Sequence, residues 1–270
     1  MNLAESKINI GFIGAGVMGT ALIKSLLDSS IKPDHIFVCE KDEARVSEVA
    51  NSLKVNALSL IDIVKKCHVL FLAVKPQDLE NLLNEIGDKL NADTLIISIA
   101  AGKKTKLIEN LIKTANPVIR VMPNTPAQIG KGVCVISAGS NATKKDLELT
   151  KQLLDKSGLV VEVNESDQDA VTALSGSGPA YFFAFVESVI NSGVNLGLSK
   201  EVATQLAVGT ILGSAAMLNE SGQDAATLRK NVTSPNGTTA AALKVFTDKN
   251  LDAIIHEAML AAKKRSQELA

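Results

Sequence analysis

The feature that most constrains the fold is a glycine-rich turn near the start of the chain. An apolar run at residues 8–13 leads into Gly-Ala-Gly-Val-Met-Gly at 14–19, and a helical pattern follows at 20–27. A G-x-G-x-x-G turn between a strand and a helix is typical of a dinucleotide-binding domain, although a tight turn without a ligand has the same pattern. In the dinucleotide interpretation, Gly14 permits the turn, Gly16 lets the backbone approach a pyrophosphate, and Gly19 lets the helix lie close to the strand.

Short apolar runs alternate with longer segments of helical period in the first part of the chain. The runs lie at 8–13, 35–39, 69–73, 94–98 and 117–121. This alternation predicts a parallel sheet covered by helices. Strand-like stretches at 132–137 and 159–163 flank a helical segment, and we expect them to extend the same sheet.

The hydrophobic period changes near Asn164, after which Ala, Leu and charged residues recur at helical spacing to the end of the chain. We therefore expect two domains. Residues 1–163 form an α/β domain of the Rossmann type, with a doubly wound, mainly parallel sheet that binds the dinucleotide. Residues 164–270 form a second, all-helical domain.

Four glycines interrupt the apolar patterns of the helical half. Because Gly costs about 1 kcal/mol relative to Ala inside a helix, these positions indicate close contacts between helices. The contacts are either within one subunit or between two subunits, and the many apolar positions of this half make a homodimer a reasonable expectation. The glycines are Gly193, Gly197, Gly209 and Gly213.

Composition narrows the choice of partners. The 28 Lys and Arg nearly cancel the 29 Asp and Glu, so no long-range field draws the surface toward nucleic acid or anionic lipid. Aromatic residues make up 3% and Trp is absent, which leaves few platforms for stacking single-stranded bases. The three scattered cysteines fit buried thiols better than a disulfide framework or a metal cluster. We expect a small-molecule substrate, no nucleic-acid partner and no metal.

The same data favour a cytoplasmic location without a membrane partner. Residues 1–9 carry charges and lack the pattern of a secretory signal. No apolar stretch is expected to approach the roughly 20 residues that span a bilayer.

The second predicted strand ends at Glu40, about 20 residues beyond the glycine turn, where a dinucleotide-binding domain contacts the adenosine ribose. A carboxylate there accepts hydrogen bonds from the 2′-hydroxyl of NADH and repels the 2′-phosphate of NADPH. Lys41 and Arg45 are close enough in sequence to neutralise that phosphate. Both NADH and NADPH therefore remain candidates.

Other candidate segments follow the ends of later strands, where ligands bind in open α/β sheets. Residues 73–77 read Ala-Val-Lys-Pro-Gln, and residues 98–102 read Ser-Ile-Ala-Ala-Gly. Taken alone, Lys75 also fits a surface lysine, and Pro76 fits the first residue of a helix. The two prolines of the 120–126 loop either present Asn124 to a nicotinamide or form a purely structural turn.

In the helical half, residues 232–239 read Val-Thr-Ser-Pro-Asn-Gly-Thr-Thr. Ser234 fits an N-cap and Pro235 the first residue of a helix, so the free N–H groups of residues 236–238 are expected to hold an anion such as a carboxylate. Capping alone does not explain why Gly and two Thr, poor helix formers, should begin the helix.

Five segments together resemble the pyrroline-5-carboxylate reductase family, in order and over essentially the whole chain. They are residues 12–19, 73–77, 120–126, 176–181 and 232–239. The glycine turn is common, but V-T-S-P-x-G-T-T after G-S-G-P-A-Y is close to diagnostic. The resemblance implies that NAD(P)H reduces the C=N bond of 1-pyrroline-5-carboxylate to give L-proline, the last step of proline synthesis. It also implies a helical domain interlocked with that of a second subunit, and larger rings of dimers.

Motifs and resemblance together assign the site residues. In the mechanism that they imply, Thr239 is the catalytic residue, whose hydroxyl bonds the ring nitrogen, and either Thr239 or water delivers the proton. The substrate residues are Asn231, Ser234, Gly237, Thr238 and Thr239. The cofactor residues are Ile13, Gly14, Ala15, Gly16, Val17, Met18, Gly19, Glu40, Ala73, Val74, Lys75, Pro76, Ala100 and Asn124.

Two departures from the family pattern bear on these assignments. Glu40 stands where a relative has a small hydroxyl residue for the NADPH 2′-phosphate. Asn236 replaces the first of two family glycines, at what we expect to be an early helical position.

Two other functions are compatible with the glycine turn. A hydroxyacid or imine reductase of similar plan needs a Lys or an acid in the helical half. A non-catalytic dinucleotide sensor needs no catalytic hydroxyls, and the presence of Thr238 and Thr239 argues against it.

Overall fold

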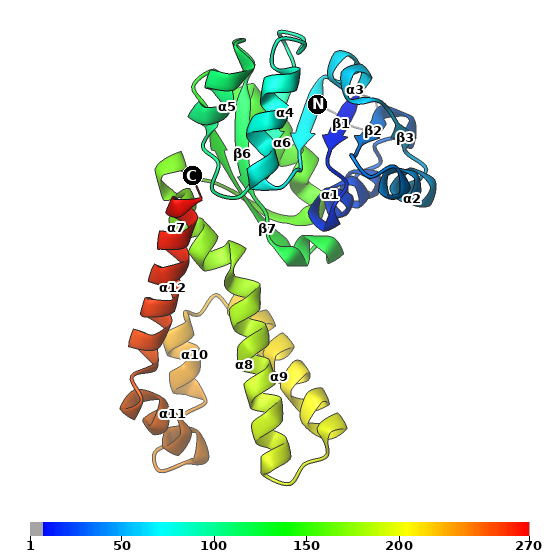
Figure 1. Ribbon diagram of the computed structural model, residues 1–270. Coiled ribbons are helices and arrows are strands. Elements are labelled where there is room, and N and C mark those ends of the chain that lie inside the picture. Colours follow the sequence, from blue (N-terminus) through cyan, green and yellow to red (C-terminus); the bar gives the residue numbers. More distant parts are fainter. Residues whose placement is uncertain (1–7, 270) are drawn as a thin grey trace. The chain divides into compact units, whose positions relative to one another are not determined.

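The computed structural model describes residues 8–269, which divide into two compact units (Figure 1). The sheet unit contains residues 8–177 and 262–269, and the helical unit contains Gly178–Ala261. The expectation about a secretory signal concerns residues 1–9, most of which lie outside the described part.

The structural division falls 14 residues beyond the predicted boundary, after Ser177 rather than after residue 163. Residues 165–177 remain with the sheet unit because their polar side chains bond to it. Gln168 Nε2 donates to Val135 O at 3.2 Å, and the Glu165 carboxylate accepts from the Thr105 N–H at 2.7 Å. The C-terminal residues join the same unit, where Ser266 Oγ donates to Asp169 Oδ1 at 2.7 Å.

The helical unit is built from α8 to α11 and most of α12. The helices are α8 (Gly178–Asn195), α9 (Lys200–Glu220), α10 (Ala225–Asn231), α11 (Thr238–Asp248) and α12 (Leu251–Glu268). The glycines play different parts. A Cβ on Gly193 of α8 would lie 3.2 Å from Ala203 Cβ of α9, so this glycine serves packing within the chain. A Cβ on Gly209 or Gly213 would meet nothing within 4 Å.

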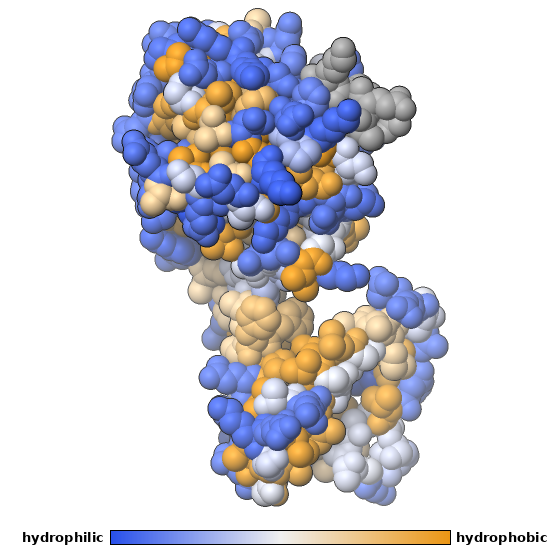
Figure 2. Space-filling model, turned by 90° about the vertical axis from the view of Figure 1, so that its right-hand side faces the viewer, coloured by the Kyte–Doolittle hydropathy of each residue, from blue (hydrophilic) through white to orange (hydrophobic). Residues whose placement is uncertain are grey.

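Large apolar side chains are exposed on α8 and α9, and Figure 2 shows hydrophobic residues gathered on the surface of the helical unit. Phe183 is 67% exposed and Leu212 is 66% exposed. The 21-residue α9 is long and apolar enough to cross a membrane by length and composition alone, so the expectation that no stretch approaches bilayer length is wrong. An exposed apolar helix also arises where a partner subunit covers it.

The sheet unit has eight strands in the order β3-β2-β1-β4-β5-β6-β7-β8. The strands are β1 (Ile10–Ile13), β2 (Ile36–Cys39), β3 (Asn56–Ala57), β4 (Val69–Leu72), β5 (Leu95–Ser98), β6 (Val118–Met122), β7 (Gly132–Ala138) and β8 (Gly158–Glu162). All neighbours pair in parallel except β6 and β7, which are antiparallel. The first six follow the Rossmann order, which confirms the predicted fold class, and β7 and β8 extend the sheet as expected.

Helices cover both faces of this sheet (Figure 1). One face carries α1 (Val17–Asp28), α2 (Glu43–Leu53) and α6 (Lys144–Leu154); the other carries α3 (Leu60–Lys66), α4 (Leu79–Ile86) and α5 (Thr105–Ile112). Shorter elements are η2 (Pro33–His35), η3 (Pro76–Asp78), η4 (Thr125–Ile129), η5 (Asp155–Ser157), η6 (Glu165–Asp167), α7 (Gln168–Val171) and the π-helix η7 (Thr172–Gly176).

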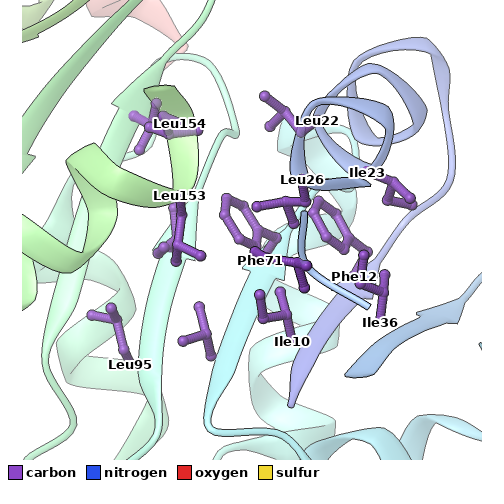
Figure 3. Close-up of a cluster of buried hydrophobic side chains, with 14 of the residues drawn as sticks. Ile10, Phe12, Leu22, Ile23, Leu26, Ile36, Phe71, Leu95, Leu153 and Leu154 are labelled. Atoms are coloured by element: carbon purple, nitrogen blue, oxygen red, sulfur yellow. The ribbon is translucent and has the colours of Figure 1, made fainter. Parts of the chain in front are cut away.

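Alternation along β1 places its side chains in two separate cores. Phe12 lies in the core under α1, and Ile13 lies in the core under α3 and α4. The Phe12 ring stacks on Phe71 of the neighbouring β4, with centroids 4.5 Å apart and planes 3° from parallel (Figure 3). This packing fixes the end of β1, from which the glycine turn begins.

Candidate cofactor and substrate sites

A pocket of about 770 Å³ lies at the carboxyl ends of β1, β2 and β4 in the sheet unit. Its position is the one at which open α/β sheets bind ligands, and its size suits a small-molecule ligand. Several predicted cofactor residues line it, namely Ile13, Gly14, Gly16, Glu40, Ala73, Val74 and Lys75.

The surroundings of Gly14 and Gly19 match the tight turn and the close packing that the motif predicts, and those of Gly16 leave room for a ligand. Gly14 has φ +104°, and a Cβ there would lie 2.5 Å from Ala73 O, so only glycine fits this turn. A Cβ on Gly19 would lie 2.6 Å from Gly14 O, which shows how closely α1 approaches β1. A Cβ on Gly16 would meet nothing within 4 Å. Gly16 therefore leaves open space beside the pocket, as a bound pyrophosphate requires.

The start of α1 offers donors to an anion. Gly16 is the N-cap, and the first helical hydrogen bond runs from the Thr20 N–H to Gly16 O at 2.9 Å. The N–H groups of Val17, Met18 and Gly19 precede that bond and have no helical acceptor. They and the positive end of the helix dipole suit a pyrophosphate.

Glu40 and Arg45 hold the peptide groups of the buried Ala15 from both sides. The Ala15 N–H donates to Glu40 Oε2 at 2.9 Å, and Ala15 O accepts from Arg45 Nε at 2.9 Å and from Thr20 Oγ1 at 3.1 Å. Glu40 Oε1 also accepts from the Lys41 N–H at 2.7 Å. These contacts fix the glycine turn without any ligand, and they orient the Glu40 carboxylate at the end of β2.

The sequence patterns do not predict the pocket wall that follows β3. Leu58, Ser59 and Leu60 line the pocket directly after β3, a strand of two exposed residues that no hydrophobic pattern reveals. A local signal did exist, because Ser59 caps α3 by accepting from the Asp62 N–H at 3.2 Å, and Ser-x-x-Asp is recognisable as a helix start.

The thiol of Cys39 also lines the pocket, at the end of β2. Burial raises the pKa of this thiol, and the nearby carboxylates of Glu40 and Glu85 raise it further. The thiol is therefore protonated at neutral pH and is no nucleophile. Cys39 acts as an apolar part of the wall.

Three further predicted cofactor residues, Pro76, Ala100 and Asn124, do not line this pocket. Pro76 begins η3, as expected of a first helical residue, and Ala100 is buried at 3% exposure beyond β5. Asn124 is also buried, and both ends of its amide are used: Oδ1 accepts from the Val133 N–H at 2.8 Å, and Nδ2 donates to Ser175 O at 3.1 Å. These bonds support the structural alternative for Asn124, a brace between the loop after β6 and η7.

The 232–239 segment of the helical unit folds differently from the prediction. Ser234 is no N-cap, because α11 begins at Thr238 with Gly237 as its N-cap. Residues 234–237 form a turn closed by a 3.1 Å bond from the Gly237 N–H to Ser234 O. Pro235 and Asn236 are its central residues, and Asn236 has φ +60°, as the third residue of a type II turn requires.

This turn explains the departure at Asn236. The position is left-handed rather than early helical, so glycine suits it best, and Asn is among the few residues that tolerate the same conformation. A Cβ on Gly237 would overlap Ser234 Oγ and lie 3.2 Å from Ser234 O, so a larger residue at 237 would require the Ser234 side chain to rotate away.

The predicted substrate residues all lie in the helical unit. The helix start places the N–H groups of Thr238, Thr239 and Ala240 before the first helical bond, from the Ala241 N–H to Gly237 O. Within the described residues the hydroxyls of Thr238 and Thr239 make no hydrogen bond, whereas Thr247 Oγ1 of the same helix bonds Leu243 O. Asn231 ends α10 and donates to Gln223 Oε1 at 3.0 Å.

A Rossmann sheet with an open glycine turn, together with a helix start that offers free donors, defines the class of dinucleotide-dependent oxidoreductases. A family model described as "NADP oxidoreductase coenzyme F420-dependent" matches residues 9–102. Another, described as "Pyrroline-5-carboxylate reductase dimerisation", matches residues 165–269.

Whole-chain comparisons agree with these matches. The pyrroline-5-carboxylate reductase of Corynebacterium melassecola is 38% identical, with 96% of this chain and 98% of the relative covered. That of Arabidopsis thaliana is 36% identical, with 99% and 97% covered. The solved reductase of Coxiella burnetii has a TM-score of 0.92 at 34% identity, covering 98% and 99% of the two chains. The Plasmodium falciparum enzyme, solved with NADP bound, has a TM-score of 0.87 at 32% identity, covering 97% and 98%.

The chain belongs to the pyrroline-5-carboxylate reductase family. It is an NAD(P)H-dependent oxidoreductase, as the sequence predicts.

Proposed function

We propose that this chain reduces the C=N bond of 1-pyrroline-5-carboxylate with NAD(P)H and releases L-proline. The observation that carries the proposal is the start of α11, which follows a fixed turn and presents N–H groups that have no helical acceptor. Two hydroxyls of the same helix start make no hydrogen bond within residues 8–269. The substrate has the matching groups, a carboxylate and a ring nitrogen. Family membership and the pocket of the sheet unit supply the cofactor side of the proposal.

The start of α11 is proposed to hold the substrate. The N–H groups of Thr238, Thr239 and Ala240 bind the carboxylate, as the start of a helix does for an anion. The Ser234–Gly237 turn keeps these donors in place, and Asn231 lies at the end of the preceding helix. The Thr239 hydroxyl bonds the ring nitrogen, whose charge changes during reduction.

The sheet unit is proposed to hold the cofactor through residues that fit its pyrophosphate and ribose. The N–H groups of Val17, Met18 and Gly19 bind the pyrophosphate, and the open space at Gly16 admits it. Ala73, Val74 and Lys75 line the pocket on the β4 side. The dinucleotide supplies a hydride when bound, so the chain needs no nucleophile or metal of its own for that step.

The direct test is the oxidation of NAD(P)H by the purified chain with 1-pyrroline-5-carboxylate. We expect turnover that depends on both substrates, with L-proline as the product. Cofactor binding without turnover would favour a dinucleotide-sensing role. Turnover of a hydroxyacid substrate in place of the cyclic imine would favour the other reductase class.

The helical unit is further proposed to form a homodimer, consistent with its match to a dimerisation domain. A groove of about 630 Å³ between α8 and α9 is lined by apolar side chains that include Phe182, Phe185 and Leu206. Glycines with open surroundings on α9 allow another helix to approach closely. A second copy of the chain would bury this surface. Rings of such dimers are proposed from the family resemblance.

Leu212→Glu on α9 tests the dimer, with Leu159→Glu as its matched control. Both leucines are exposed, at 66% and 62%, but Leu159 lies on β8 of the sheet unit. We expect Leu212→Glu to raise the Kd of dimerisation roughly 30-fold or more, the effect of losing an interface anchor worth about 2 kcal/mol. Light scattering across a dilution series measures this and detects larger rings. An unaffected dimer in Leu212→Glu, or a monomeric wild type, contradicts the proposal.

A cytoplasmic location is proposed because the three cysteines are unpaired. Burial raises the pKa of Cys67 to about 12 and also raises that of Cys134. Free thiols of this kind suit a reducing compartment.

A further inference from the structure

We infer that this chain uses NADH in preference to NADPH, and that Glu40 sets the preference. The inference rests on the proposed oxidoreductase function and adds the identity of its cofactor. Three observations carry it: the fixed position of the Glu40 carboxylate, the contacts that occupy Arg45, and the charge of the pocket.

The Glu40 carboxylate lies in the pocket wall at the end of β2, where the adenosine ribose binds in a Rossmann domain. Each of its oxygens accepts one backbone N–H, Oε2 from Ala15 and Oε1 from Lys41. These bonds hold the carboxylate in place, and a carboxylate oxygen can accept a further hydrogen bond. A ribose hydroxyl is such a donor, whereas an ionised 2′-phosphate is a second anion.

Arg45 does not compensate for this charge, because its guanidinium is engaged elsewhere. Nε donates to Ala15 O at 2.9 Å, Nη1 pairs with Glu48 at 2.8 Å, and Nη2 donates to Thr20 Oγ1 at 3.2 Å. Arg45 is also not among the residues that line the pocket. The sequence alone left Arg45 as a possible phosphate partner, and the structure assigns it to the glycine turn.

The remaining charges of the pocket also disfavour a phosphate. Four acidic residues line it against two basic ones. Lys41, the basic residue next to Glu40, is 84% exposed at its side chain and has its Nζ 3.9 Å from Asp78 Oδ1. The pocket is therefore net acidic. Its charged lining residues are Glu40, Glu43, Asp78, Glu85, Lys41 and Lys75.

The test is the Kd of NADH and of NADPH for the whole purified chain, measured by ligand fluorescence without the imine substrate. The wild type should bind NADH about ten-fold or more tightly than NADPH, a difference of about 1.4 kcal/mol. Because no turnover is needed, this result is independent of whether the chain reduces 1-pyrroline-5-carboxylate. Equal affinities, or tighter binding of NADPH, would overturn the inference.

Glu40→Gln keeps the size of the side chain and removes its charge. It should raise the ratio of NADPH to NADH affinity about ten-fold or more, since the lost repulsion acts at close range. Glu43→Gln is the matched control, because Glu43 is an acidic residue of the same pocket and, within the described part of the chain, no hydrogen bond joins its side chain to the glycine turn as one joins Glu40 to Ala15. We expect the control to change the ratio by less than about three-fold, as for a screened surface charge. Equal shifts in both variants would assign the preference to the general charge of the pocket and overturn the role of Glu40.

Discussion

Gly16→Val is expected to abolish NAD(P)H binding while the chain remains folded. The Cβ at this position projects into space that contains no protein atom within 4 Å, and the backbone has φ −67°, which valine adopts readily. The branched side chain then occupies the volume beside the free N–H groups of α1, where the pyrophosphate would lie. We expect the Kd of NADH and NADPH to rise by more than about 100-fold, or about 2.7 kcal/mol.

Two measurements separate lost binding from lost structure. Valine is a poorer N-cap than glycine, so the free energy of unfolding should fall by no more than about 1 kcal/mol. Gly14→Ala serves as the contrasting variant, because its Cβ would lie 2.5 Å from Ala73 O in a backbone with φ +104°. It should destabilise the fold well beyond Gly16→Val. Unchanged cofactor affinity in a folded Gly16→Val variant would remove the dinucleotide site from the glycine turn.

The cofactor site was easier to predict from the sequence than the substrate site, because the features that define it are local in sequence. The three glycines act through the backbone conformation and through space within a few residues of the turn, and β1 and β4 follow from continuous apolar runs. The two-residue β3 has no such run, so the pocket wall at Leu58–Leu60 was missed. Patterns of this kind reveal a buried strand and leave a short exposed one undetected.

The conformation of the predicted substrate site was harder to predict, because the sequence of residues 234–237 fits two local structures. Ser-Pro at 234–235 fits an N-cap followed by a first helical residue, and Ser-Pro-Asn-Gly at 234–237 equally fits a type II turn. The second alternative is the observed one, since Asn236 accepts a positive φ and the next residue, Gly237, caps α11. Anion binding at this helix start stays a prediction, and the observed start of α11 moves the expected donors to Thr238 and the residues after it.

The sequence could not decide between the two roles considered for Asn124, because the hydrogen-bond partners of this residue are distant in sequence. Its amide joins Val133, nine residues away, to Ser175, 51 residues away. No pattern around Asn124 reveals these partners, so a role at the nicotinamide and a structural role were equally supported by the sequence. The compact sheet unit continues past residue 163 for the same reason, since Glu165 and Gln168 tie their segment to the sheet through long-range bonds.

Thr239→Ala is expected to reduce kcat/KM roughly 10- to 150-fold with cofactor affinity nearly intact. The loss corresponds to one hydrogen bond to a charged or charging group, worth about 1.5–3 kcal/mol. The Thr239 hydroxyl has no hydrogen-bond partner within the described residues, so its removal should leave the fold unharmed, and Ala is the better helix former.

The controls for Thr239 distinguish its hydroxyl from its place in the helix. Thr239→Ser retains the hydroxyl and should recover most of the lost kcat/KM. Thr247→Ala removes a threonine from the same helix, one whose hydroxyl bonds Leu243 O, and should leave kcat/KM near the wild-type value. Near-normal turnover of Thr239→Ala would limit Thr239 to packing or to its backbone N–H. The ring nitrogen would then receive its hydrogen bond and proton from water, because Thr238, the other free hydroxyl of this helix start, lies one residue and about 100° away around the helix axis.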